Sequence, residues 1–278
     1  MHERMRRACA HPSFAVGCVL VGLLVLSALV SLVWTPWPPA EIDIPNKLAG
    51  PSLAHWFGTD SLGRDVASQL LAGSQNSIVV GLMAVGIGLV FGVSLGLLAA
   101  AQRGWTDELV MRLADFTFAF PALLMAIMLS AIYGPGLYIS IVAIGIFNIP
   151  VFARITRGAA VAIWARDYTL AARACGMGRW RITLDHVLPN VLGLLIVQAT
   201  VQFAMAILAE AALSYLGLGT QPPQASWGRM LNEAQAQLFQ APQLAFYPGL
   251  AIAFSVLGLN LLGDGLRDLL DPKLVRQR

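Results

Sequence analysis

Charged side chains are scarce in this sequence. Asp, Glu, Lys and Arg make up 12% of the 278 residues, whereas 57% are hydrophobic and the mean hydropathy is +0.70. This composition excludes an ordinary soluble globular domain, in which about a quarter of the residues are charged. A helix needs roughly 20 apolar residues to cross a bilayer. A bundle of several spans therefore uses nearly the whole chain and leaves no room for a separate soluble domain.

The residues that build catalytic and metal sites are also few. The three cysteines, Cys9, Cys18 and Cys175, lack metal-ligand spacing and indicate no disulfide framework. The four histidines lie in separate segments, without a Ser/His/Asp set or paired carboxylates. A phosphate-binding P-loop ends in Gly-Lys-Ser/Thr, and neither Lys47 nor Lys273 stands in such a setting. We expect no enzymatic activity, no cofactor or metal site, and no nucleic-acid partner.

Six apolar stretches are long enough to cross a membrane: residues 14–34, 78–101, 109–133, 137–155, 191–213 and 244–262. The first follows Arg4, Arg6 and Arg7, as a signal peptide would, but it is too long and lacks a small-residue cleavage site. We expect it to remain as an anchor. The sequence thus predicts an all-α membrane protein. Residues 1–75 form an anchor helix with an outer segment, and residues 76–278 form a five-helix core.

The basic residues predict the orientation, because Lys and Arg concentrate in the cytoplasmic loops of membrane proteins. With the N-terminus inside, every Lys and Arg except Lys47, Arg64 and Arg229 falls in a cytoplasmic segment. Both termini are therefore predicted to be cytoplasmic. Residues 35–77 and 217–243 are expected to form ordered caps on the outer face.

Glycine and proline predict how the spans pack. Gly88, Gly92 and Gly96 recur every four residues, so they share one helix face and allow another backbone to approach closely. Pro121 and Pro150 interrupt the third and fourth spans, where neighbouring helices must satisfy the backbone groups that proline leaves unpaired. Kinks that shape a cavity and simple packing kinks both fit this pattern.

Polar side chains within spans are costly and normally face protein or water. The fifth span carries four that we interpret as part of a translocation path or gate, or as hydrogen-bond partners of another subunit: Gln198, Gln202, Glu210 and Ser214. On the third span, Arg112 and Asp115 are three residues apart and are expected to pair on one helix face.

The loop at residues 165–190 carries the most specific pattern. Residues 167–176 predict a short helix stopped by Gly176, and a second segment, 177–188, is expected to be broken by Pro189. Small Ala171 and Ala172, followed by Gly176, allow a tight helical corner that fits a groove on another protein. An amphipathic helix lying on the inner membrane surface is the alternative.

This loop resembles the "EAA" loop of ABC importer permeases, whose coupling helix docks onto an ATPase subunit. Ala171-Ala172, Gly176 and Leu188-Pro189 match its spacing. Leu170 differs from the acidic residue usual at its position. The resemblance implies that the ATPase contacts come from Ala171, Ala172, Arg173, Gly176, Arg179, Arg181, Leu188 and Pro189.

Further segments extend the resemblance over residues 55–275. Residues 55–65, 213–219, 222–223, 226–228 and 260–268 resemble the dipeptide/oligopeptide/nickel permease family, and the long first outer segment resembles its C-type member. The outer motif comprises Gly58, Thr59, Asp60, Gly63, Arg64 and Asp65. It is expected to organise the outer turn or to meet a substrate-binding protein, and a solvated turn is the alternative.

The resemblance implies a type I importer in a bacterial inner membrane. In such an assembly, a homologous permease completes a heterodimer embedded in lipid, two separate ATPase subunits hold ATP and Mg, and an extracytoplasmic binding protein delivers the substrate. Short peptides are the expected cargo, with nickel or another small solute as the alternative. A passive channel or secondary transporter, which would need no coupling loop, is the alternative from a different class.

Overall fold

The computed structural model describes residues 12–270, and within them the only regular secondary structure is helical, apart from one isolated bridge between Thr59 and Asp65. The long helices are α2 (Pro12–Val33), α3 (Val66–Ile87), α4 (Ser94–Gln102), α5 (Trp105–Ala119), α6 (Ala122–Tyr133), α7 (Leu137–Trp164), α10 (Leu188–Tyr215) and α12 (Gln243–Leu270). The short elements are η1 (Ile44–Asn46), the π-helical η2 (Gly88–Val93), α8 (Asp167–Ala174), α9 (Arg179–Ile182), the π-helical η3 (Thr183–Val187), α11 (Trp227–Ala234) and η4 (Gln235–Gln237).

Five helical stretches in the described residues are long and apolar enough to span a membrane: Pro12–Val33, Val66–Gln102, Leu137–Trp164, Arg179–Tyr215 and Gln243–Leu269. The α5–α6 pair supplies a sixth if it counts as one span. The predicted all-α bundle is thus confirmed. The predicted division of the chain at residue 75 stays a prediction. Helix α3 runs through that residue.

The third predicted span is a broken helix and not a straight one. Helices α5 and α6 meet at 81°. Pro121 stands at the break, where Phe120 is extended (φ −95°, ψ 129°), because a residue before proline disfavours the helical conformation. Pro150, by contrast, lies inside the continuous helix α7.

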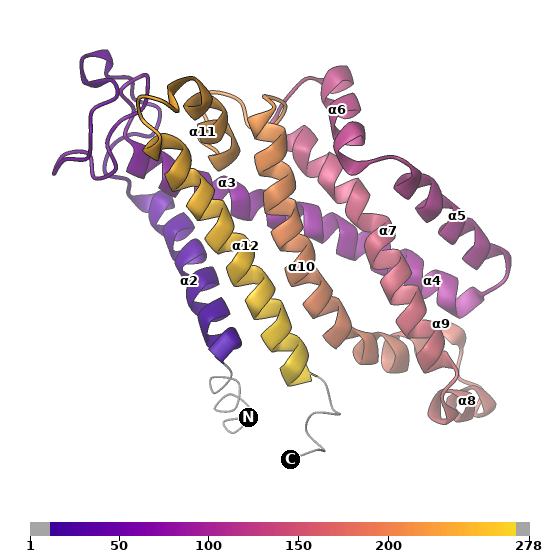
Figure 1. The fold of residues 1–278 in the computed structure, drawn as a ribbon. Helices are drawn as coiled ribbons and strands as arrows, with labels where there is room; N and C mark the ends of the chain where they lie inside the picture. The colour runs from indigo at the N-terminus through magenta and orange to yellow at the C-terminus, as the bar shows by residue number, and fades with distance from the viewer. Residues whose placement is uncertain (1–11, 271–278) are drawn as a thin grey trace.

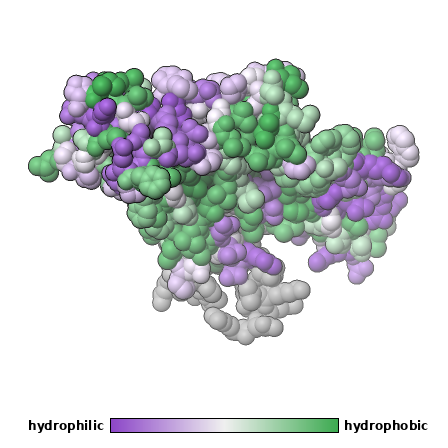
Figure 2. All heavy atoms as spheres, turned by 45° about the horizontal axis from the view of Figure 1, so that its top comes forward, coloured by the Kyte–Doolittle hydropathy of each residue, from purple (hydrophilic) through white to green (hydrophobic). Residues whose placement is uncertain are grey.

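The spans form a slanted row, and a polar element lies beyond each of the two ends of the helices (Figure 1). Helices α2, α12, α10 and α7 follow one another across the bundle, with α5 and α6 at the far edge. Helix α8 lies at one end. The cap, which we define as residues 34–65 together with α11, lies at the other. In Figure 2 hydrophobic residues cover the middle of the bundle, and hydrophilic ones gather toward its sides in that view.

The three glycines let helix α7 cross close to η2 and α4. A Cβ atom on Gly92 would lie 2.5 Å from the carbonyl oxygen of Ile149, and one on Gly96 would lie 2.5 Å from that of Ala153. Both distances are too short for any side chain. The predicted close approach of another backbone at this glycine face is confirmed.

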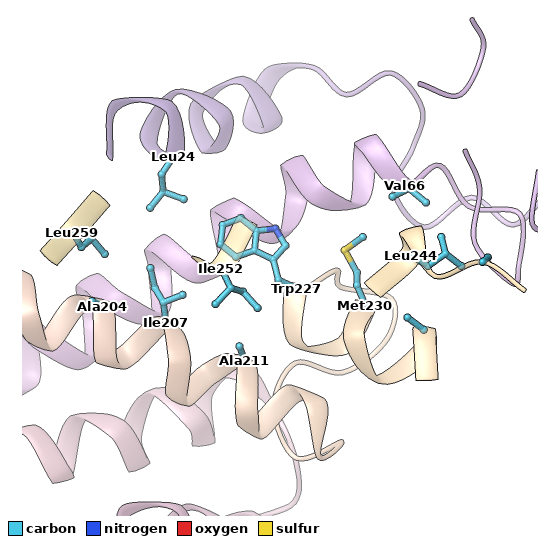
Figure 3. Close-up of a cluster of buried hydrophobic side chains, with 12 residues drawn as sticks. Leu24, Val66, Ala204, Ile207, Ala211, Trp227, Met230, Leu244, Ile252 and Leu259 are labelled. Carbon is cyan, nitrogen blue, oxygen red and sulfur yellow. The ribbon is translucent and has the colours of Figure 1, made fainter. Parts of the chain in front are cut away.

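A buried hydrophobic cluster ties the cap to the spans. Trp227 of α11 lies among side chains of α3, α10 and α12 (Figure 3). Its indole N–H donates to the carbonyl oxygen of Leu70 at 3.0 Å, and its ring fills the space that Gly73 leaves open. A large aromatic side chain with its polar atom satisfied stabilises such a contact strongly. Helix α11 is therefore fixed to the bundle.

Candidate functional site

The residues that carry the family resemblance form an elbow, which we define as residues 165–190. Its first helix, α8, ends where Gly176 adopts a φ of +82°. The Gly176 N–H donates to the carbonyl oxygen of Arg173 at 3.0 Å, and the Met177 N–H donates to that of Ala172 at 3.1 Å. This pair of bonds is the Schellman motif. The predicted short helix stopped by glycine is confirmed.

Thr169 attaches α8 to the end of α7. Its side chain is buried, with the hydroxyl 2.6 Å from the carbonyl oxygen of Arg166 and 2.9 Å from that of Ile163. Thr169 was not predicted from the sequence. A threonine two residues into a helix after a polar turn is the signal that could have revealed it, because such hydroxyls bond to nearby backbone groups.

The predicted break at Pro189 is wrong. The chain is helical from Arg179 through η3 into α10, and Pro189 occupies the first turn of α10. Proline cannot donate a backbone hydrogen bond, and the wider π-helical turn just before it accommodates that loss. The elbow is therefore directly continuous with a membrane span.

The inner side of the elbow is packed into the bundle. Ile182 and Val187 are completely buried in a cluster with Trp164 of α7 and Val191 of α10, and residues of α3 and α4 belong to the same cluster. Ala172 and Leu188 are half-buried against it. A displacement of the elbow must therefore move α7, α10 and α4 together, because close-packed interiors transmit strain.

The outer side of the elbow is open. Ala171, Gly176 and Pro189 are exposed together with three of the predicted cationic residues: Arg173, Arg179 and Arg181. Large apolar side chains lie beside them, with Leu170 51% and Trp180 56% exposed. A rigid surface that combines apolar and arginine side chains is typical of protein interfaces.

The outer motif forms a buried turn in the cap. The Asp60 carboxylate accepts hydrogen bonds from the Leu62 and Arg64 backbone N–H groups at 2.8 and 3.0 Å, and from the Arg64 Nε at 2.6 Å. A Cβ atom on Gly63 (φ +79°) would overlap the carbonyl oxygen of Asp43. The solvated-turn alternative is therefore wrong.

The rest of the motif begins helix α3. Asp65 accepts a hydrogen bond from the Ser68 backbone N–H at 2.8 Å and so caps α3. Thr59 is buried beside it, and its hydroxyl accepts from the Ala49 N–H at 2.9 Å; Gly58 directly precedes it. Loss of such a cap costs about 0.5–2 kcal/mol.

Arg64 joins this turn to α11. Its guanidinium contacts Glu233, whose carboxylate also accepts from Arg229 Nε at 2.8 Å. Burial lowers the pKa of Arg64, but the charges of Asp60 and Glu233 and their hydrogen bonds raise it by more, so its pKa lies above the ordinary value. The role of Glu233 was not predicted, because its contact with Arg64 joins segments 169 residues apart in the sequence.

The four predicted path residues do not form one site. Glu210 Oε1 accepts from Ser214 Oγ at 2.6 Å and lies 3.2 Å from Thr220 Oγ1. Gln202 is buried and Gln198 half-buried further along α10; Gln198 is twelve residues from Glu210, which is about 18 Å along a helix. Because Glu210 is fully buried within its own chain, this conformation leaves it no surface for another subunit.

The predicted pair of Arg112 and Asp115 is wrong. Arg112 instead contacts Glu108, one turn earlier, at 2.6 Å, and Asp115 contacts Arg154 of α7. Among the described residues, no three His, Cys, Asp or Glu side chains lie close enough together to hold a metal ion.

The fold defines a multi-span membrane protein, and its elbow presents an exposed surface with the composition of a protein interface. The chain belongs to the family of binding-protein-dependent transport system inner membrane components, whose sequence model matches residues 92–276. It is a permease subunit of an ATP-binding cassette importer, which confirms the resemblance and excludes the passive channel and secondary transporter. The family places it in the inner membrane as a multi-pass protein, acting with a partner permease, an ATPase and a binding protein.

Individual relatives cover most of the chain. The dipeptide transport system permease protein DppC of Alkalihalophilus pseudofirmus is 43% identical over 93% of this chain and 85% of its own length. The glutathione transport system permease protein GsiD of Escherichia coli O157:H7 is 44% identical over 98% of this chain and 90% of its own length. The inward-facing MetNI methionine ABC transporter shares the fold, with a TM-score of 0.61, 19% identity, and 73% of this chain and 97% of that chain covered.

Proposed function

We propose that this chain is the C-type permease of a heterodimeric importer for short peptides. The observation that carries this proposal is its 43–44% identity, over more than nine-tenths of its length, to permeases named for dipeptide and glutathione transport. Both named cargoes are short peptides. No observation on the described residues favours nickel, the alternative cargo.

Coupling to ATP hydrolysis takes place at the elbow. The ATPase, a separate polypeptide that holds ATP and Mg, docks on the exposed residues of α8 and α9. Thr169 connects α8 to α7, and the buried Ile182 and Val187 connect the second half of the elbow to α10. Closure of the ATPase dimer would therefore move these spans together and convert nucleotide binding into alternating access.

The elbow and both termini face the cytoplasm, whereas the cap faces outward and receives the binding protein. The distribution of Lys and Arg supports this orientation. The buried Asp60–Arg64–Glu233 contacts support the role of the cap, because they hold it as one rigid platform. Glu210 and Ser214, near the outer end of α10, fasten the loop that leads to this platform through Thr220.

An uptake assay tests this function. The chain is reconstituted into proteoliposomes with its partner permease, ATPase subunits and binding protein, and ATP-dependent uptake of a labelled dipeptide is measured. Ala171→Trp enlarges an exposed position and should abolish both ATPase co-purification and uptake. Ala40→Trp, also at an exposed position but in the cap, should leave ATPase co-purification intact. ATP-coupled uptake that survives in Ala171→Trp would refute the docking role, and failure of the unmodified importer to transport any peptide would refute the cargo.

A further inference from the structure

Two ion pairs join the broken span to helix α7. Arg157 donates to both carboxylate oxygens of Asp107 at 2.7 and 2.6 Å. Arg154 contacts Asp115, and its guanidinium lies 4.4 Å from the centre of the Phe118 ring. The two pairs differ in their access to solvent: the Asp107 side chain is 19% exposed, whereas that of Asp115 is 66% exposed.

Arg154 lies inside the candidate span α7 and not in a cytoplasmic segment, where the sequence analysis placed it. Helix α7 has 28 residues and is therefore about 42 Å long, against a hydrocarbon core of about 30 Å. Arg154 is ten residues from the end of the helix at Trp164, or about 15 Å. For a helix centred in the bilayer, this places Arg154 about 9 Å inside the hydrocarbon.

An exposed ion pair at this depth cannot face lipid, because ionisable groups within membranes face protein or a water-filled cavity. The pair leaves much of both side chains open, with Arg154 42% exposed. A protein neighbour that covered it would remove two charges from water and would have to supply matching polar groups. A water-filled path needs no such partner.

The break between α5 and α6 lies beside this pair. Asp115 stands five residues before Phe120, where the chain turns by 81°. In many transporters, substrate sites are formed by discontinuous helices near the middle of the membrane. This observation is independent of the charges, and it indicates the same location.

We propose that Asp115 and Arg154 form a contact site for the charged ends of a peptide in the translocation path, an inference that rests on the proposed peptide cargo. A free peptide carries an ammonium group at one end and a carboxylate at the other. Arg154 presents a planar guanidinium that matches a carboxylate, and Asp115 presents an acceptor for an ammonium group. The two side chains pair with each other when the path is empty and separate to bind the peptide ends.

The test measures how the uptake rate of each variant depends on the charge at each end of the peptide. Uptake is compared at saturating binding protein for a dipeptide, its C-terminal amide and its N-acetyl derivative. Arg154→Gln should lower the maximal uptake rate of the free dipeptide at least about tenfold, the loss expected for a charge-assisted hydrogen bond, and should affect the amide much less. Asp115→Asn should likewise lower the uptake of the free dipeptide and should affect the N-acetyl derivative, which lacks the ammonium group, much less.

The matched control is Arg157→Gln, which removes the neighbouring ion pair between the same helices. It should lower the uptake of all peptides equally. Equal losses for all peptides in Arg154→Gln would overturn the proposal. Failure of the unmodified importer to transport peptides would instead refute the cargo itself.

A second measurement tests the proposal without the Arg154→Gln and Asp115→Asn variants, in case these do not assemble. Asp115→Cys is introduced into a chain whose three cysteines are replaced by serine, and a membrane-impermeant thiol reagent is added to the reconstituted importer on both sides. Labelling of the cysteine at position 115 that becomes slower when a dipeptide is added supports the proposal. Leu23→Cys, on an exposed position of α2, should remain unlabelled in the lipid. An unlabelled Asp115→Cys would show that lipid or a partner covers this site and would overturn the proposal.

Discussion

Replacing Gly176 by alanine should weaken coupling through backbone strain alone. Gly176 has a φ of +82°, and a Cβ atom there would meet no atom within 4 Å. The substitution therefore causes no clash and costs about 1–2 kcal/mol from the left-handed conformation. Since 1.4 kcal/mol corresponds to about a tenfold change in an equilibrium, the population of the native elbow relative to an unwound one falls by about fivefold to thirtyfold. ATP-dependent uptake should fall several-fold in proteoliposomes that hold a limiting amount of ATPase.

Gly178→Ala is the matched control for this prediction. Gly178 lies two residues away in the same elbow, and a Cβ atom there would likewise meet no atom within 4 Å, but its φ of −65° suits any residue. Its uptake should equal that of the unmodified protein. Gly176→Asn should show an intermediate loss, because asparagine tolerates a positive φ better than alanine does. Uptake by Gly176→Ala at the unmodified level, or an equal loss in Gly178→Ala, would refute this reasoning.

Three further predictions concern packing, the buried carboxylate and orientation. Gly92→Leu should force α7 away and destabilise the protein by about 1–3 kcal/mol, which a lower unfolding temperature in detergent would show. Gly86→Leu, in open space on the same span, should not destabilise it. Equal destabilisation by both variants would contradict the close crossing. Glu210→Leu should cost about 1–3 kcal/mol, because it removes the carboxylate that accepts from the Ser214 and Thr220 hydroxyls. Glu210→Gln should cost less, and equal unfolding temperatures for the two variants would argue against this bonding. Cysteine at Asn46 should react with an impermeant reagent from outside the cell and cysteine at Arg179 only from inside; the reverse result would overturn the orientation.

Much of the fold could be predicted from the sequence because lipid imposes a simple rule on span length. The rule failed at the start of the second span. Helix α3 begins at Val66, twelve residues before the predicted start at residue 78. The prediction omitted its first turns because they carry the polar residues Ser68, Gln69 and Ser74. These residues are buried against the protein and not in lipid, so their polarity misled a prediction based on hydropathy.

The candidate site was predictable only where its contacts are local. α8 stops at Gly176 through hydrogen bonds from Gly176 to Arg173 and from Met177 to Ala172, three and five residues earlier than their donors, and such spacing is visible in a sequence. Arg64 and Glu233 are 169 residues apart, and Asp115 and Arg154 are 39 residues apart. Pairs of this kind depend on how helices pack, which residue spacing does not reveal.

Site-specific crosslinking at the elbow would show whether the ATPase binds there. A photoreactive amino acid replaces exposed Ala171, the assembled importer is irradiated in its membrane, and the captured protein is identified by mass spectrometry. We expect the ATPase subunit to be captured at position 171, and not to be captured when the photoreactive amino acid replaces Ala40 in the cap. Capture of lipid alone at Ala171, in an importer that still transports with ATP, would contradict the claim that the motor acts on the bundle here.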